Sequence, residues 1–292
     1  MTLGHAWSPA IAAVFCFGAP LAAQQLNPGP LVLSQPGSTR ALALGNAFVL
    51  GAEDSDAIFY NAALADQLRG ISAAYQTTPQ PDEDGRLFTF SGATEWWGGA
   101  AAIGVQAISY GAPRDESVNG VPATGIVGAI AYARRILGIR FAATGKLIEQ
   151  RFGEARSSTV AFDIATARTI GFVNVGLAAS NMGPNLDFDS PYDGNLPERM
   201  TLSASTRARP AGPLDLLATG AITSDIDGNI TGGVGVETAY WPISGRTFFA
   251  RVGLLHDETD HITLGAGFTG DRIGLDYAYV DGGGHRAGIR WR

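Results

Sequence analysis

The sequence predicts a transmembrane antiparallel β-barrel of about 14 strands with an N-terminal plug or hatch segment. Three observations support this all-β fold: charges of one parity within alternating segments, connections that are alternately long and tight, and tryptophans gathered at one end of the strands. Side chains on a strand point alternately to opposite faces, so charges of one parity indicate one polar and one apolar face. Outer-membrane barrels place the apolar face against lipid and the polar face in the lumen.

A signal peptide is expected at residues 1–23. Residues 9–23 are almost wholly apolar and precede Gln24-Gln25, which resembles an export signal cleaved near Ala23. The single cysteine, Cys16, lies within it, so the mature chain is expected to fold without a disulfide. No later stretch offers about 18 consecutive apolar residues for a transmembrane helix. An exported chain with strands that face lipid points to the outer membrane.

Residues 24–70 differ from the rest and are expected to form an N-terminal extension and plug or hatch segment. The run Asn27-Pro28-Gly29-Pro30 argues against regular structure at its start. The barrel is expected to occupy residues 71–292. Its predicted strands lie at roughly 71–79, 86–97, 99–110, 125–136, 138–150, 157–169, 172–182, 199–208, 214–224, 230–241, 246–256, 261–270, 272–280 and 284–292.

Parity assigns most strand charges to the lumen. In the segment around Asp276, for example, Ile273, Leu275 and Tyr277 share the opposite face. Only Arg168 falls on the apolar side, at a strand end where a long side chain can reach water. The predicted lumen charges are Arg140, Lys146, Asp163, Arg207, Glu237, Arg251, Asp276, Arg286 and Arg290.

Parity alone does not show which face is inside, because a soluble β-sandwich also alternates. The two ends of the strands favour the barrel. Connections after odd strands are mostly polar and acidic, those after even strands are tight and carry arginines, and short periplasmic turns with longer outer loops are typical of outer-membrane barrels. Aromatic residues gather at membrane interfaces. The predicted periplasmic-side rim comprises Trp96, Trp97, Tyr240, Trp241 and Trp291.

Three short motifs in the N-terminal segment resemble the PorV/PorQ family of outer-membrane proteins, within the broader FadL-like barrel group. They are Ala43-Leu44-Gly45-Asn46-Ala47-Phe48-Val49, Asp54-Ser55 and Asn61-Ala62-Ala63-Leu64, where Ala62 replaces the proline of the family. The resemblance continues at residues 175–183, 196–197, 275–279 and 285–286. It implies a plug in a fourteen-stranded barrel, with Gly45, Ala47, Phe48, Asp54, Ser55 and Asn61 as the plug motif.

The resemblance implies two transport roles. In the PorV branch the barrel works with the type IX secretion machinery, so the partners would be secreted proteins or components of that machine. In the FadL-like group the plug gates the passage of apolar small molecules. The polar inward face slightly favours the secretion role, the FadL-like channel is the alternative, and a purely structural surface barrel is the third hypothesis. Each requires outer-membrane lipid around the barrel.

Several patterns imitate catalytic or metal sites, but none is convincing. Residues 265–270 match a dinucleotide fingerprint, yet a strand rather than a helix is predicted to follow. His256 and His261 stand among acidic residues of a predicted hairpin, and residues 225–229 resemble the start of a calcium loop without its final acidic ligand. We therefore expect a non-enzyme without cofactor or metal. The net charge of −7 argues against a nucleic-acid partner.

Charges in a narrow barrel must pair or stay hydrated, because an unpaired buried ion is very costly. The favoured hypothesis is a structural network that braces the wall and docks the plug through Arg40, Glu53, Asp54 and Asp56. The alternative hypothesis is a selective polar pore lined by these charges.

Overall fold

The computed structural model describes residues 30–50, 54–67, 69–79, 84–111, 121–188, 194–257 and 259–291. The predicted signal peptide and Glu53 lie outside these ranges, as do parts of the predicted outer loops. No helix within the described ranges is long and apolar enough to span a membrane.

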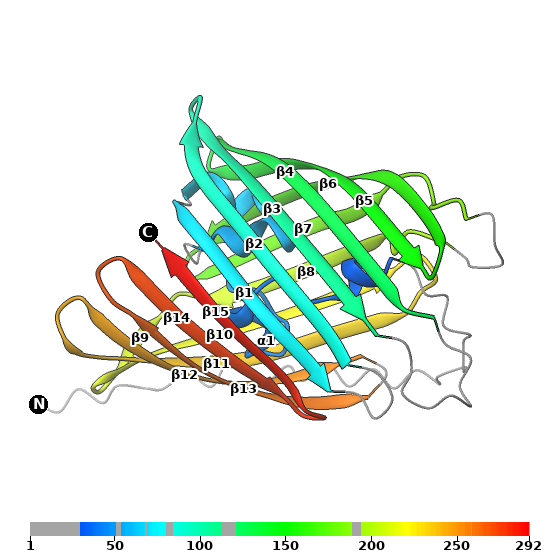
Figure 1. Cartoon of the computed structure of the whole chain (residues 1–292). Helices are drawn as coiled ribbons and strands as arrows, with labels where there is room; N and C mark the ends of the chain where they lie inside the picture. Colours follow the sequence, from blue (N-terminus) through cyan, green and yellow to red (C-terminus); the bar gives the residue numbers. More distant parts are fainter. Residues whose placement is uncertain are drawn as a thin grey trace, which may run out of the picture.

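The described strands form a single antiparallel sheet that closes on itself (Figure 1). Closure occurs where β15 pairs with β1, from Ile71 opposite Trp291 to Thr77 opposite His285. Both β8 and β9 pair with β10 and form one interrupted strand. The fifteen labelled strands therefore build a barrel of fourteen strands. The strands are β1 (Gly70–Pro79), β2 (Asp84–Trp96), β3 (Gly99–Tyr110), β4 (Ala123–Ile136), β5 (Ile139–Phe152), β6 (Ala155–Ile170), β7 (Val173–Met182), β8 (Arg199–Thr206), β9 (Arg209–Ala211), β10 (Leu214–Asp225), β11 (Ile230–Ile243), β12 (Arg246–His256), β13 (Asp260–Thr269), β14 (Ile273–Val280) and β15 (Gly284–Trp291).

The exposed and buried faces of these strands decide between the barrel and the soluble sandwich. Large apolar side chains such as Ile130, Leu147 and Ile164 are more than 60% exposed on the outer surface. The alternate positions, including Asp163 and Asp276, are buried inside. A soluble sandwich would bury its apolar faces against each other. The predicted barrel is therefore confirmed, and the sandwich alternative is wrong.

Two predicted boundaries differ from the structure. Residues 151–156 were expected to form an outer loop, but β5 and β6 continue as a ladder until Phe152 pairs with Ala155. Glu149 holds this extension together, since its carboxylate accepts from Arg151 at 2.9 Å and from Arg156 at 2.5 Å. The eighth strand, predicted to run unbroken to residue 208, instead ends as β8 at Thr206 and resumes at β9.

Residues 30–50 and 54–67, the inner segment, lie inside the barrel (Figure 1). They form short helical turns, because Pro, Gly and helix-capping residues such as Ser38 interrupt longer elements; the Ser38 hydroxyl accepts from the backbone N–H of Ala41 at 3.4 Å. Apolar residues of the inner segment pack mainly on inward alanines of β3 to β7. The turns are the 3-10 helices η1 (Leu31–Ser34), η2 (Ser55–Phe59) and η3 (Ala62–Gln67) and the α-helix α1 (Thr39–Leu42).

The five rim aromatics, Trp96, Trp97, Tyr240, Trp241 and Trp291, are all exposed and stand at the end of the barrel where the short turns lie. Trp97 has a φ of +47°, next to Gly98 at +73°, in the turn between β2 and β3. Such left-handed positions usually carry Gly, Asn or Asp in two-residue hairpins. The rim therefore accepts a strained backbone and keeps a large aromatic ring at this end.

Candidate functional site

The first half of the plug motif touches the wall through backbone groups. Gly45 has a φ of +72°, and its N–H donates to the Thr263 hydroxyl at 3.0 Å. Its carbonyl oxygen would lie 1.7 Å from a Cβ built on Gly233, which explains why the wall carries glycine at this position. This part of the inner segment is thus seated on a face of the wall without side chains, the glycine face, formed by Gly233, Gly235, Gly253 and Gly265.

Wall side chains then bind two carbonyl groups of the inner segment, those of Phe48 and Leu50. Phe48 stacks on Tyr60 with ring centroids 5.0 Å apart, and its carbonyl accepts from the Thr219 hydroxyl at 3.2 Å. The carbonyl of Leu50 accepts from Asn174 at 2.9 Å and from Ser205 at 2.8 Å. Ala47, the remaining motif residue of this run, is fully buried. The irregular backbone therefore finds its hydrogen-bond partners in the barrel wall.

Asn61 anchors the second half of the inner segment. Its amide group donates to the backbone carbonyls of Thr166 at 3.0 Å and Leu177 at 3.4 Å, which face each other across β6 and β7. The side-chain oxygen Oδ1 of Asn61 accepts from the backbone N–H of Ala63 at 3.1 Å. One side chain therefore joins the inner segment to two strands.

Six charged residues form a closed ring of alternating sign, the ionic ring: Arg40, Glu237, Arg251, Asp276, Arg290 and Asp54, in this order. Arg40 and Asp54 come from the inner segment, and the other four come from β11, β12, β14 and β15. Each arginine contacts two carboxylates and each carboxylate contacts two arginines. The ring is therefore electrically balanced, with three charges of each sign.

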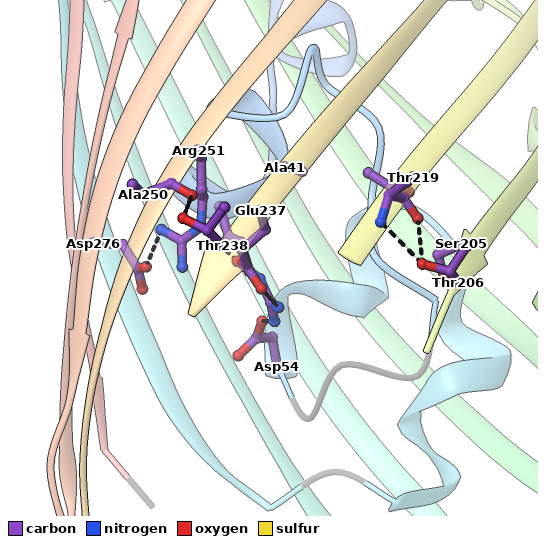
Figure 2. Close-up of polar contacts among 12 residues, drawn as sticks. Ala41, Asp54, Ser205, Thr206, Thr219, Glu237, Thr238, Ala250, Arg251 and Asp276 are labelled. Carbon is purple, nitrogen blue, oxygen red and sulfur yellow. Dashed lines mark hydrogen bonds and ion pairs between the residues drawn. The ribbon is translucent and has the colours of Figure 1, made fainter. Parts of the chain in front are cut away.

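The contacts around the ionic ring are short. Arg251 donates to Glu237 at 2.7 Å and to Asp276 at 2.6 Å, and Arg40 donates to Glu237 at 2.5 Å and to Asp54 at 3.2 Å. Arg290 pairs with Asp54 and lies 2.8 Å from Asp276. Figure 2 shows Arg251 between Asp276 and Glu237, with Asp54 beyond Glu237. Buried charges require this degree of pairing to offset the loss of water.

Two neighbouring carboxyl groups of the inner segment respond differently to this environment. Burial alone raises the pKa of Asp54, but Arg290 and Arg40 outweigh it and hold that pKa well below the ordinary value. Burial raises the pKa of Asp56, and the hydrogen bond from the Ser91 hydroxyl at 2.7 Å only partly opposes this shift. Asp54 is thus held as an anion by the ionic ring, while Asp56 is the more easily protonated of the two.

Asp56 belongs to a second polar cluster, which also contains Ser55 of the plug motif. The Ser55 and Ser91 hydroxyl oxygens are 2.7 Å apart, which connects η2 to β2. Arg286 lies nearby and is fully buried without a carboxylate contact among the described residues. Its guanidinium instead donates to Thr39, Gln76 and Thr89 and to the carbonyls of Pro36 and Gly37, at 2.7–3.2 Å.

A third polar cluster stands on the opposite side of the lumen. Lys146 of β5 lies 2.7 Å from the Asp163 carboxylate and donates to the Asn181 side chain at 2.8 Å. Asp163 also accepts from the backbone N–H of Asn181 at 2.8 Å. The ladder between β6 and β7 shifts register at this point, and Asn181 has a φ of +63°. The carboxylate thus satisfies a donor at a β-bulge.

A cavity of about 120 Å³ lies between the inner segment and the wall from β3 to β10. Phe48, Phe59 and Tyr60 of the inner segment line it, together with Lys146 and Arg199 of the wall. Amide and hydroxyl side chains, including Asn61 and Asn181, complete the lining. Burial raises the pKa of Tyr60 to about 12, so its hydroxyl stays protonated and donates to Asn46 at 2.8 Å.

Two arginines, Arg199 and Arg207, have the odd numbering of the inward-facing residues of β8, but only one of them lines the lumen. Arg207 was expected in the lumen, but it follows the end of β8, is exposed, and contributes nothing to the lumen contacts described above. Arg199 has the same parity, begins β8 and lines the cavity, and the sequence analysis missed it. Its odd number, which Arg207 shares, is the sequence feature that could have assigned it to the lumen. Arg140 is buried on the inward face of β5.

The patterns that imitate other sites take ordinary barrel conformations. Residues 265–270 end β13, and β14 rather than a helix follows. His256 contacts Asp260 at 2.7 Å, and His261 lies 3.6 Å from Asp257 and 2.8 Å from Thr259, so the two imidazoles have separate partners. Within the described ranges, no group of three or more His, Cys, Asp or Glu residues is placed to hold a metal ion.

The start of the calcium-like loop is also a turn. Asp225 ends β10, and its carboxylate accepts from the backbone N–H of Asn229 at 2.7 Å and from the Asn229 side chain at 2.8 Å. These bonds close the connection to β11, in the manner expected of Asp in tight turns. The Asp225 carboxylate therefore stabilises the turn through hydrogen bonds from Asn229.

No family model matches the sequence, and no curated protein is similar to it. Two solved structures share its fold. The CymD monoaromatic hydrocarbon channel is 11% identical with a TM-score of 0.50, over 89% of this chain and 96% of that chain. The TodX monoaromatic hydrocarbon channel deltaS2 mutant is 9% identical with a TM-score of 0.57, over 88% of this chain and 97% of that chain.

At these identities the likeness shows the fold alone. It agrees with the predicted fold, a closed antiparallel β-barrel. The PorV/PorQ branch, the signal peptide and the absence of catalysis stay predictions.

Proposed function

We propose that this protein is an outer-membrane channel for small, largely apolar molecules and that the inner segment gates its lumen as a plug. The observation that carries the proposal is the cavity of about 120 Å³ between the inner segment and the wall from β3 to β10. Molecules can cross only if the inner segment shifts, because the cavity is too small to serve as a continuous pore. Monoaromatic hydrocarbons are the first compounds to test, since two structures of similar fold are named as channels for them.

The asymmetry of the inner segment's contacts supports a gate that moves on one side. The ionic ring and the glycine face hold residues 38–45 against β11 to β15. On the other side, alanines of β3 to β7 offer small, apolar contacts that allow displacement. A rotation of the helical turns η2 and η3 about Asp54, which directly precedes η2, would enlarge the cavity while Asp54 keeps its contacts in the ionic ring.

The secretion role implied by the PorV/PorQ resemblance stays a prediction. The occupied lumen leaves no room for a polypeptide to cross, so such a role would depend on the barrel's outer surfaces. No contact in the described residues favours that role over the channel.

A disulfide between η2 and β2 tests the gate. Ser55→Cys and Ser91→Cys replace two hydroxyl oxygens that are 2.7 Å apart, a position from which a disulfide of about 2.05 Å can form with a small adjustment. Oxidation should lower toluene uptake by proteoliposomes at least tenfold, and reduction should restore it. The reduced double variant is the matched control, because it has the same sequence and the same barrel.

Equal uptake by the oxidised and reduced proteins would show that η2 does not gate the channel. Wild-type proteoliposomes that take up toluene no faster than empty liposomes would instead contradict the channel itself. Uptake is measured with radiolabelled toluene, and cross-linking is verified by mass spectrometry.

A further inference from the structure

The charges around the cavity point to a narrower class of ligand. Lys146 and Arg199 both line it, whereas Asp163 is the one carboxylate in ion-pair contact with either of them among the described residues. Among the described residues, the Arg199 guanidinium donates to the Ser34 hydroxyl at 3.5 Å, while the carboxylates of Asp225 and Asp163 attract it from beyond ion-pair distance. An apolar cargo alone gives no reason for placing Arg199 at its cavity, because desolvating a cation without a carboxylate in contact is unfavourable.

These two cations have hydrogen-bond donors left over that match an anion. The Lys146 ammonium has three donors, of which two are engaged by Asp163 and Asn181. The guanidinium of Arg199 carries five donors and matches a carboxylate in a bidentate geometry. Together they provide the charge-assisted bonds by which proteins recognise organic acids.

The other walls of the cavity limit the rest of the ligand. Phe48, Phe59 and Tyr60 offer aromatic surface, and Phe48 and Tyr60 are stacked 5.0 Å apart. The volume of about 120 Å³ is close to that of an engineered cavity, about 150 Å³, which binds benzene. A single ring therefore fits, whereas a long alkyl chain does not fit within this volume.

We infer that the cavity binds a small organic acid, a carboxylate carried on an apolar group no larger than one ring, with Arg199 and Lys146 on the carboxylate and the aromatic residues of the inner segment on the ring. This inference deepens the proposed function and rests on it in one respect: it takes the cavity as the place where the transported molecule binds. It changes the expected cargo from a neutral hydrocarbon to an amphipathic anion.

Equilibrium binding of benzoate and toluene to the purified barrel tests the inference. The two probes have similar rings and differ in the carboxylate. Wild-type protein should bind benzoate at least tenfold more tightly than toluene. Arg199→Gln should weaken benzoate binding about tenfold or more and change toluene binding less than twofold. Arg199→Lys keeps the charge but loses the bidentate geometry, so it should weaken benzoate binding less than Arg199→Gln does.

Arg246→Gln is the matched control, because Arg246 is exposed at the start of β12 and its substitution should leave both affinities unchanged. Circular dichroism verifies that each variant keeps its barrel. Equal binding of benzoate by wild type and Arg199→Gln would overturn the inference, as would a wild-type preference for toluene. Uptake of toluene and benzoate separates the two proposals: toluene uptake without benzoate binding refutes only the inference, whereas Arg199-dependent benzoate binding without uptake of either probe refutes only the channel.

Discussion

The wall formed by β11 to β15 and the wall formed by β3 to β7 contact the same inner segment in different ways. The first wall presents four charges of the ionic ring and the glycine face, where backbone meets backbone. The second presents alanines and leaves a cavity beside them. Charge pairing and close backbone approach require one geometry, while small apolar contacts tolerate several. We therefore infer that the first wall fixes the position of the inner segment, while the second wall permits its displacement.

The largest effect on stability is expected from breaking the ionic ring. Arg251→Met removes the fully buried cation that Glu237 and Asp276 share. Removing one partner of a buried ion pair typically costs about 3–5 kcal/mol, because the remaining charges stay buried without full compensation. We expect a loss of this size in urea unfolding of the barrel in lipid vesicles.

The matched control for the ionic ring is Arg272→Met, which removes an exposed arginine at a short turn. A change of less than about 0.5 kcal/mol is expected there. If both variants lost the same stability, the ionic ring would not be what fixes the inner segment.

An intermediate effect is expected from filling the glycine face. Gly233→Val places a Cβ 1.7 Å from the carbonyl oxygen of Gly45, so the inner segment must shift away. Overpacking of this kind costs about 1–3 kcal/mol. The displaced segment should be cleaved faster by an added protease, as measured by mass spectrometry. Gly128→Val is the control, because a Cβ there meets nothing within 4 Å, and equal cleavage of both variants would contradict the seating argument.

The smallest effect on stability is expected at the alanine wall. Ala178→Leu extends a buried side chain that lines the cavity, so the added carbons have space. Stability should change by less than about 1 kcal/mol, since the substitution fills a void rather than a packed region. Uptake of toluene should nevertheless fall at least fivefold. Normal uptake by this variant would place the route of transport elsewhere.

Two neighbouring carboxyl groups of the inner segment, Asp54 at the first wall and Asp56 beside Ser91 of β2, should respond to acid in opposite ways. Asp54 has a folded pKa below the ordinary value of 3.8, so its contribution to stability is present above that value and is lost as pH falls below it. Asp56 has a raised pKa in the folded protein. Its buried charge therefore lowers the free energy of unfolding at neutral pH, and this loss disappears as the pH falls from the raised pKa towards the ordinary value. Acid therefore weakens the attachment at the ionic ring and relieves the cost at Asp56.

Alternation along the chain was enough to predict the barrel and its fourteen strands, and it placed most of the charged strand residues on the inward face. These features are local, since the alternation around Asp276 and the tight turn at Trp97-Gly98 depend on side-chain direction and turn chemistry within a few residues. The same local logic failed at Arg207, because parity shows which way a residue points but not where the strand ends. It also passed over Arg199, whose parity was the same.

The partners of these inward residues depend on the three-dimensional fold. The ionic ring joins Arg40 and Asp54 to Glu237, Arg251, Asp276 and Arg290, residues that are up to 250 positions apart and come together only when β15 closes on β1. The need of the Gly233 position for glycine likewise depends on the path of Gly45 inside the barrel. Parity placed most of these charges in one lumen, but closure of the sheet and the route of the inner segment set their partners, because both depend on contacts between distant parts of the chain.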